Sequence, residues 1–333
     1  MNLLTNIARA GYDFLSLPVM AQISDGLLMR RFTRLAQAAE RRIEPAGSWP
    51  KVTVVVPVYN VERYLTLCLQ SLRAQQYPNL NVVAVNDGST DESASILETF
   101  KDKMNLNIVT QKNAGLAAAR NAGVKAIKST DYLMFLDSDD ALAPGALHKL
   151  VAMITKTKSD FVVGDVTRLK GLTRVKRVDT RALFKQGSVP ATTFKRQPNA
   201  VLDVTAWNKL FDFKFYKAAK ISFPSMYFED MSEMTRAYAE AAHFDILAET
   251  IYLWRVRTEG ARSITQQKSD EIKLNDRIKS LREIKKIIEL AIKDDRATNA
   301  NMDAFRARIV AHDRKLYREE VENIDEMFKS LLS

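Results

Sequence analysis

Residues 131–140 read DYLMFLDSDD, an apolar run that ends in acidic side chains. Similar apolar runs, rich in Val and Ile, lie at 52–56, 81–85, 107–109 and 161–164. Stretches with helical spacing alternate with them, at 61–75, 91–101, 114–128 and 144–157. Continuous apolar strands that alternate with helices are typical of a mainly parallel sheet with helices on both faces. The sequence therefore predicts a Rossmann-like α/β fold.

Polar segments follow four of these runs: PVYN (57–60), NDGSTDES (86–93), QKNAG (111–115) and DSDD (137–140). Ligands of parallel sheets bind beyond the carboxyl ends of the strands, where these segments are expected to lie. Turn formation alone could explain Asn, Asp, Gly and Ser at a strand end. It does not explain Asp87, Asp137 and Asp139 at one edge, because like charges repel unless a cation or ligand offsets them.

Asp137 and Asp139 flank Ser138 directly after a predicted buried strand. Two carboxylates at this spacing offer hard oxygen ligands to Mg²⁺ or Mn²⁺, and water and phosphate oxygens can fill the remaining positions. The glycine-rich dinucleotide and P-loop motifs are both absent. The pattern therefore favours a metal that bridges the phosphates of a nucleotide.

The composition is that of a globular protein of 333 residues, with 46% hydrophobic residues. A single cysteine, Cys68, excludes an internal disulfide, and three scattered histidines leave no Cys/His cluster for zinc. No apolar run reaches the roughly 18 residues that a spanning helix needs, and no basic segment precedes a signal-like stretch. We therefore expect a cytoplasmic protein, with the inner face of the membrane as a further place of association.

The net charge of +10 arises largely from one segment, 166–196. This segment contains nine basic residues and a single acid, Asp179. The basic residues are Arg168, Lys170, Arg174, Lys176, Arg177, Arg181, Lys185, Lys195 and Arg196. Such a block indicates an anionic partner: nucleic acid, an acidic membrane surface or a phosphorylated substrate.

The ordered series VTVVVPVYN, VNDGSTDES, NAGLAAARNAG (113–123), DYLMFLDSDD, WNKLF (207–211), FED (228–230) and YLWRVR…RSIT (252–265) resembles the inverting glycosyltransferases of family 2, which have the GT-A fold. The resemblance runs from about residue 50 to 265. It implies three parts: a helical N-terminal extension (1–48), a GT-A domain (49–266) and a helical C-terminal region (267–333).

By this resemblance each motif receives a role. Glu229 and Asp230 match the acceptor site, with Asp230 as the general base. Asp139 matches the metal ligand, with Asp137 beside it, so that the implied cofactor is Mn²⁺ or Mg²⁺. Asp87 would accept a hydrogen bond from uracil. The residues implied in donor binding are Pro57, Val58, Tyr59, Asp87, Asn113, Arg120, Asp137 and Ser138.

Several of these residues also have plain structural explanations. Glu229 and Asp230 could be the first acids of a helix, where they favour its macrodipole. Trp207 and Lys209 could pack or cap, or contact the acceptor or the diphosphate. Arg255, Arg257 and Arg262 could be solvated, or close over the diphosphate.

Both terminal regions show amphipathic patterns. The N-terminal helices, expected within 1–45, could pack on the main domain or touch a membrane surface through Arg30, Arg31 and Arg34. The C-terminal helices could cap the catalytic domain or mediate homo-oligomer formation.

The leading hypothesis is a metal-dependent inverting transferase that moves a sugar from a nucleotide-sugar, expected to be UDP-linked, to a hydroxyl of a glycan, polyol-phosphate or lipid-linked acceptor. The basic block falls on the acceptor side of the motifs, which favours an anionic acceptor over nucleic acid. The processive Q-x-x-R-W signature is missing after Asp230, which favours single transfers. The alternatives are a metal-dependent nucleotidyl- or phosphotransferase acting on a sugar or polyol, and a basic nucleic-acid-binding protein.

Overall fold

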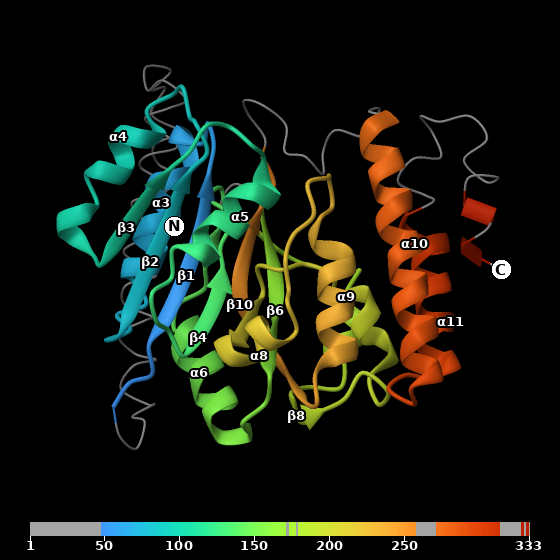
Figure 1. Cartoon of the computed structure of the whole chain (residues 1–333). Coiled ribbons are helices and arrows are strands. Elements are labelled where there is room, and N and C mark those ends of the chain that lie inside the picture. Colours follow the sequence, from blue (N-terminus) through green and yellow to red (C-terminus); the bar gives the residue numbers. More distant parts are fainter. Residues whose placement is uncertain are drawn as a thin grey trace, which may run out of the picture.

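The computed structural model describes residues 48–170, 173–177, 179–257, 271–313, 328–329 and 331–332. The N-terminal helices predicted within 1–45 lie outside this range. The described residues form a ten-stranded sheet in the order β3-β2-β1-β4-β9-β6-β10-β5, with β7 on β6 and β8 on β10 (Figure 1). The strands are β1 (Val52–Val58), β2 (Leu80–Asn86), β3 (Leu106–Thr110), β4 (Tyr132–Phe135), β5 (Ala141–Leu142), β6 (Phe161–Lys170), β7 (Thr173–Lys176), β8 (Val189–Thr192), β9 (Lys209–Asp212) and β10 (Phe244–Arg255).

The helices connect and cover these strands. They are α3 (Glu62–Arg73), α4 (Ser93–Glu98), α5 (Leu116–Lys125), α6 (Ala146–Thr157), α7 (Arg181–Phe184), α8 (Phe213–Ala218), α9 (Asp230–Glu240), α10 (Glu271–Lys293) and α11 (Asn299–Arg308), with short 3₁₀ or π segments at Lys101–Lys103, Pro198–Leu202 and Ile309–Asp313. Within the described residues, no helix is both long and apolar enough to cross a bilayer.

The sheet is mixed. β1 pairs in parallel with β2 and β4, β2 with β3, and β6 with β10. β9 is antiparallel to both β4 and β6, so β6 runs in the same direction as β4. The α/β class and the five predicted strands are confirmed, while β9 is a strand that the apolar pattern did not reveal. The carboxyl ends of β1, β2, β4, β6 and β10 lie at one edge.

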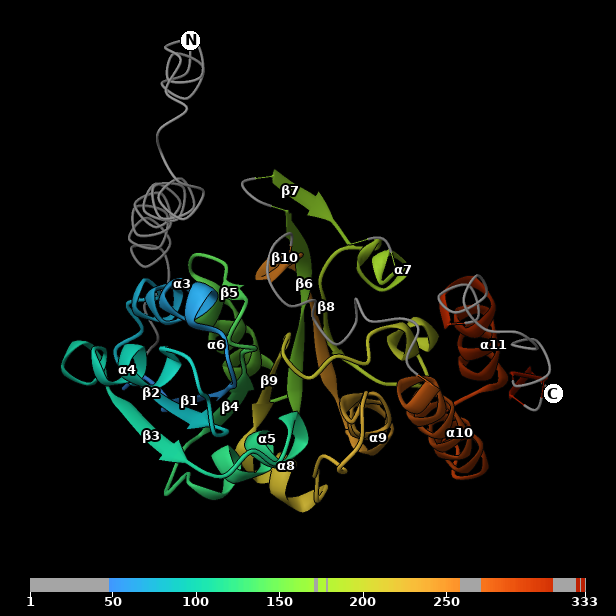
Figure 2. The same ribbon diagram turned by 90° about the horizontal axis from the view of Figure 1, so that it is seen from above.

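Alternate residues of the strands enter two different cores, as the period of a strand requires. Val55 and Phe135 pack on the side of α5, α8 and α9. Val54 and Met134 pack on the side of α3, α4 and α6. Figure 2 shows these two helix layers on opposite sides of the sheet. Burial on both faces explains why the strands are continuous apolar runs.

Two predicted helices begin later than their patterns suggested. The predicted helix at 114–128 starts at Leu116, after Gly115 with φ +88°. Asn113 therefore lies in the preceding loop and not on the first helical turn. The predicted helix at 144–157 starts at Ala146, after Gly145 in the left-handed region. In both cases a glycine with positive φ precedes the first residue of the helix.

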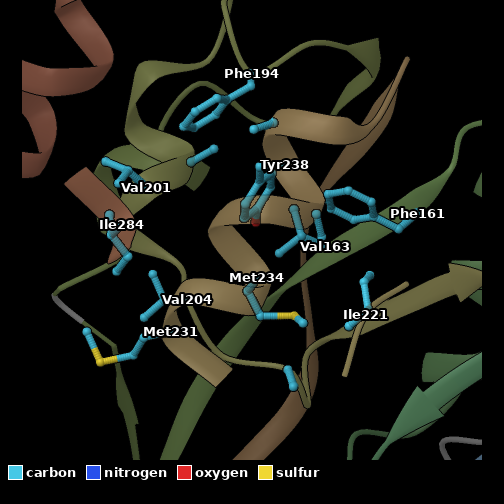
Figure 3. Close-up of a cluster of buried hydrophobic side chains, with 14 of the residues drawn as sticks. Phe161, Val163, Phe194, Val201, Val204, Ile221, Met231, Met234, Tyr238 and Ile284 are labelled. Carbon is cyan, nitrogen blue, oxygen red and sulfur yellow. The ribbon is translucent and has the colours of Figure 1, made fainter. Parts of the chain in front are cut away.

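The C-terminal region is helical in its described part. Leu274, Ile278, Leu281 and Ile284 of α10 are buried in the core that also contains α9. In Figure 3, Met234 and Tyr238 of α9 lie between Phe161 and Val163 of the sheet on one side and Ile284 of α10 on the other. The helical extension is thus confirmed, and its apolar stripe is accounted for by packing on α9. Homo-oligomer formation through these helices stays a prediction.

Candidate active site

The turn after β4 is held to β10 through Asp140. This buried carboxylate accepts hydrogen bonds from the Tyr252 hydroxyl (2.7 Å) and the Arg255 backbone N–H (2.7 Å). Burial, and then the charges of Asp139 and Asp137, raise the pKa of Asp140 well above its usual range. The DSDD motif thus has a structural acid in its last position, which motif reasoning did not separate from the others.

Arg255 and Arg257 both reach the same turn. Arg255 Nε donates to the Asp139 carbonyl oxygen (2.8 Å), and Arg257 Nε donates to Asp139 Oδ2 (2.8 Å). Both guanidinium groups also lie over the ring of Tyr64, at 5.4 and 5.3 Å from its centroid. Both arginines thus lie beside the acidic turn, and their closure over the diphosphate stays a prediction. Arg262 lies outside the described residues.

Asp137 and Asp139 fit a divalent cation as two carboxylate ligands. Their side chains are 24% and 16% exposed. Each has one oxygen paired with an arginine: Asp137 Oδ1 with Arg120 and Asp139 Oδ2 with Arg257. Burial raises the pKa of Asp139, as does Asp137, and a cation would offset both effects. No group of three or more His, Cys, Asp or Glu suited to a metal occurs in the described part of the chain, so water and phosphate would complete the coordination.

Arg120 links this turn to α9. Its side chain is buried, with 1% of its surface exposed. Nη2 donates to Asp137 Oδ1 (2.7 Å) and Nη1 to Glu229 Oε1 (2.5 Å), and its guanidinium lies 5.3 Å from the centroid of Phe223. Both terminal nitrogens of Arg120 thus bind carboxylates inside the protein. The contact of Arg120 with the donor stays a prediction.

Glu229 and Asp230 stand at the start of α9 but have different surroundings. Glu229 is buried and ion-paired with Arg120, and burial raises its pKa to about 7. Asp230 is the first residue of the helix and is partly exposed; its Oδ2 accepts a hydrogen bond from the Ala206 N–H (3.3 Å). Burial raises its pKa as well, and Arg120 opposes this shift. Of the pair, Asp230 is therefore the carboxylate that a ligand can reach.

Asp87 holds two loops together. Its Oδ1 accepts hydrogen bonds from Gln111 Nε2 (2.7 Å) and the Ala114 N–H (2.9 Å), and its Oδ2 accepts one from the Gly115 N–H (2.8 Å). The side chain is 3% exposed. A carboxylate has about four acceptor sites, so one site remains for a base. The contact with uracil stays a prediction, with a structural role now observed beside it.

The tip of β1 divides into buried and exposed residues. Pro57 and Val58 are buried strand residues, and their contact with the nucleotide stays a prediction. Tyr59, just beyond the strand, is 48% exposed. Asn113 is also exposed, and its backbone lies against Gly88. Tyr59 and Asn113 are thus the accessible predicted contacts at this end of the site.

Trp207 and Lys209 lie inside the protein. Trp207 is 5% exposed and stacks on Tyr252, with ring centroids 4.2 Å apart. Lys209 is fully buried, and its Nζ donates to Asp203 Oδ1 (2.7 Å) and the Thr205 carbonyl oxygen (2.7 Å). Of the two explanations for Lys209, the structure shows a packed side chain that is neutralised by Asp203, and a contact with the acceptor or the diphosphate stays a prediction. Trp207 packs behind the site.

Most of the described part of the basic block is on the surface. Arg181, Lys185, Lys195 and Arg196 are exposed. Arg177 differs, since it is 7% exposed and ion-paired with Asp179 at 2.9 Å. The side chains of Lys170, Arg174 and Lys176 lie outside the described part of the structure. Ser138, the middle residue of the acidic turn, is buried.

Comparison with known protein families identifies the family of this chain. The family model described as glycosyl transferase family 2 matches residues 53–219, from β1 to the end of α8. The chain belongs to glycosyltransferase family 2. This membership supports the leading hypothesis over the nucleotidyl- or phosphotransferase alternative. Glu229 and Asp230 lie just beyond the matched residues.

Similar proteins include two named polymer-modifying enzymes. The chain is 28% identical over 221 residues to the poly(ribitol-phosphate) beta-N-acetylglucosaminyltransferase TarS of Staphylococcus aureus, covering 63% of the chain and 36% of TarS. It is 30% identical over 217 residues to the poly(ribitol-phosphate) beta-glucosyltransferase of Bacillus spizizenii, covering 63% of the chain and 33% of that protein. The chain thus spans about a third of the length of each relative.

The fold of this glycosyltransferase also matches a solved structure. A fragment of S. aureus TarS in complex with UDP-GlcNAc superimposes with a TM-score of 0.70 over 85% of this chain and 79% of the fragment, at 24% sequence identity. At this level of identity the likeness is one of fold. It extends beyond the family match and confirms the GT-A architecture.

Proposed function

We propose that this glycosyltransferase moves a sugar from a UDP-sugar to a hydroxyl of a phosphate-containing cell-surface polymer, with inversion at the anomeric carbon. The donor class is supported by the UDP-GlcNAc bound to the TarS fragment of the same fold. The acceptor class is supported by two relatives that act on poly(ribitol phosphate) and by the +10 charge of the chain.

The observation that carries the proposal is the double ion pair of Arg120. It connects Asp137, at the metal-binding turn, with Glu229, next to Asp230. The guanidinium of Arg120 thereby fixes the distance between the carboxylates of Asp137 and Glu229. A donor at the first site and an acceptor hydroxyl at the second would meet, which is the requirement of a displacement reaction.

Asp230 is the proposed general base. Its carboxylate takes the proton of the acceptor hydroxyl, the acceptor oxygen forms a bond to the anomeric carbon, and the bond from that carbon to the diphosphate oxygen breaks to release UDP. Attack from the face opposite the leaving group inverts the carbon in one step. Burial raises the pKa of Asp230, whereas Arg120 and the dipole of α9, which begins at Asp230, favour the ionised form that a base needs.

Asp137 and Asp139 would hold Mn²⁺ or Mg²⁺, which would offset the negative charge that develops on the departing diphosphate. Arg255 and Arg257 add positive charge at the same turn. Glu229 is a positioning residue, because its carboxylate is turned to Arg120 and is buried.

The test combines transfer and binding. Wild-type protein is given Mn²⁺, a panel of UDP-sugars and synthetic ribitol-phosphate oligomers. Asp230→Asn should lower the rate of transfer by at least about 10³-fold, since removal of a general base costs of this order, while the donor-induced rise in melting temperature persists. The matched control is Glu233→Gln, which changes an acid one turn later in α9 that pairs with Arg236. Turnover by Asp230→Asn at the wild-type rate would remove Asp230 from the base role.

A further inference from the structure

We infer that Arg177, together with Arg168 and Arg308, forms a binding site for a phosphodiester group of the acceptor, separate from the site of the donor diphosphate. The proposal deepens the proposed function and rests on it for the identity of the ligand as acceptor. The three residues come from different segments: Arg168 is on β6, Arg177 follows β7, and Arg308 ends α11.

The first observation is that each of these arginines has a buried nitrogen with no hydrogen-bond partner among the described residues. Arg177 is 7% exposed; its Nε binds both Asp179 oxygens at 3.0 Å and its Nη2 lies 2.9 Å from Asp179 Oδ2, but its Nη1 is buried and unpaired. Arg168 Nε and Arg308 Nη1 are likewise buried and unpaired. Each unpaired buried donor costs roughly 1–3 kcal/mol, and more when it is charged, which an anionic ligand would recover.

The second observation is the local charge. Among the described residues, Asp179 is an acid near Arg168, Arg177 and Arg308. Asp313 is an acid near Arg277 and Arg308. Burial lowers the pKa of Arg177, but Asp179, Asp203 and Asp165 together raise it above its ordinary value. Of these acids, Asp203 is already paired with the buried Lys209. Burial lowers the pKa of Arg308, as do Arg277 and Arg177, against the opposing effect of Asp313. At Arg308 the charges of Arg277 and Arg177 add to the effect of burial, and a monoanion bound there would offset both.

The proposed site depends more on Arg177 than on Arg308. Asp313 Oδ2 has no hydrogen bond among the described residues and lies 3.6 Å from Arg308 Nε. A small movement would therefore give Arg308 a hydrogen bond to Asp313. Arg177 already binds both oxygens of Asp179, and Asp203, another acid near it among the described residues, is paired with Lys209.

The third observation is the position of Arg177 relative to Asp230. Its guanidinium lies 5.6 Å from the ring of Trp207 and 5.5 Å from that of Trp254. Arg168 lies over the same Trp254 ring, at 4.7 Å, so the two arginines share one aromatic wall. Ala206, which precedes Trp207, donates its N–H to Asp230. The site is thus connected to the proposed base through Trp207 and Ala206. Trp207 also stacks on Tyr252, which donates a hydrogen bond to Asp140 of the acidic turn.

A phosphodiester suits this arrangement better than a diphosphate. It carries one negative charge and offers several acceptor oxygens, and arginine is the residue that pairs most specifically with such groups. A polymer that is held by its phosphate at Arg177 would bring a neighbouring hydroxyl toward Asp230. This would let the enzyme distinguish a phosphate-containing acceptor from a neutral polyol.

The experiment uses the full chain and two probes. The first is dimethyl phosphate, at low millimolar concentration and constant ionic strength, with the melting temperature as readout. We expect a saturable rise for wild type that is absent in Arg177→Gln. The matched control Lys195→Gln removes an exposed charge of the same basic block, paired with Asp295, and should respond as wild type. Equal responses of wild type and Arg177→Gln, or no response of wild type, would overturn the site.

The second probe is a ribitol-phosphate oligomer in the transfer reaction. Arg177→Gln should raise the KM for the oligomer by about 10- to 100-fold, the loss of one charge-assisted hydrogen bond, and change the KM for the UDP-sugar by less than about twofold. Equal changes in both constants would show a structural role. If wild type transfers no sugar but binds dimethyl phosphate through Arg177, the proposed function fails while the anion site stands. Arg177→Lys, which keeps the charge near Asp179, replaces Arg177→Gln if that variant does not fold.

Discussion

Arg120 and Glu229 are 109 residues apart in the sequence, yet Nη1 of one lies 2.5 Å from Oε1 of the other inside the protein. The same guanidinium binds Asp137 through Nη2. The buried, planar guanidinium of Arg120 therefore fixes the position of the end of β4 relative to the start of α9.

Arg120→Ala should destabilise the protein by about 3–5 kcal/mol, because it leaves two carboxylates without their buried partner. Arg120→Lys keeps a charge but lacks the second arm, so we expect an intermediate loss of stability and at least about 100-fold lower kcat through misplacement of Asp230. Chemical denaturation and steady-state kinetics measure both effects. Lys101→Ala, in an exposed pair with Glu98, is the control and should change stability by less than about 0.5 kcal/mol. A stable, fully active Arg120→Lys would contradict this reasoning.

The buried Glu229 should give the stability an unusual dependence on pH. Its pKa rises from the ordinary 4.5 to about 7 in the folded protein. Between these values the folded state holds a proton that the unfolded chain has lost, so this residue's contribution to the free energy of unfolding decreases as the pH rises through the window. Denaturant titrations between pH 4.5 and 8 should show a shallower decline for Glu229→Gln. Identical slopes for the variant and wild type would argue against a raised pKa.

Tyr252→Phe should uncouple the acidic turn from β10. The substitution keeps the stacking on Trp207 but removes the hydroxyl that donates to Asp140 and accepts from the Asp137 N–H. We expect a loss of about 1–3 kcal/mol, the cost of an unsatisfied buried group, together with weaker donor binding. Tyr132→Phe is the comparison on β4, where the hydroxyl lies 3.4 Å from Thr155 Oγ1. Equal, small effects of both substitutions would refute the coupling.

Metal dependence can be tested through donor binding alone. UDP-sugar should raise the melting temperature in the presence of Mn²⁺ or Mg²⁺, and a chelator should abolish most of this rise. Asp139→Asn should weaken the response to metal because it removes one hard oxygen ligand, while its hydrogen bond with Arg257 can persist through the amide oxygen. Calorimetric titration of metal into the donor-bound protein measures the effect. An unchanged metal response in Asp139→Asn would exclude this residue as a ligand.

The sequence predicted the parallel strands well because burial on both faces makes them continuous apolar runs. It also predicted that acidic and turn-forming residues gather at their ends. This reasoning did not predict β9, because the four residues of that strand, KLFD, include Lys209, whose charge is buried against Asp203. A pattern of hydrophobicity does not reveal a charged residue that is neutralised by a distant partner.

The same limit applied within the site. Arg120 and Asp87 were expected to bind the donor, and the structure shows them binding the chain itself. Their partners lie 17 to 109 residues away, so sequence spacing contains no trace of the pairing. The unpaired Nη1 of Arg177 was equally invisible, since the sequence showed only one basic residue among nine.

The reversed direction of β9 has a consequence for the dimensions of the molecule. Because β9 lies between β4 and β6, the ends of these two parallel strands stand two strand spacings apart, about 9–10 Å. The segment that enters β9 emerges in the gap between them and contributes Ala206, the partner of Asp230. Direct pairing of β4 with β6 would halve that width and close the gap. A strand of four residues thus acts as a spacer, which sets how wide a group can lie between the two halves of the sheet.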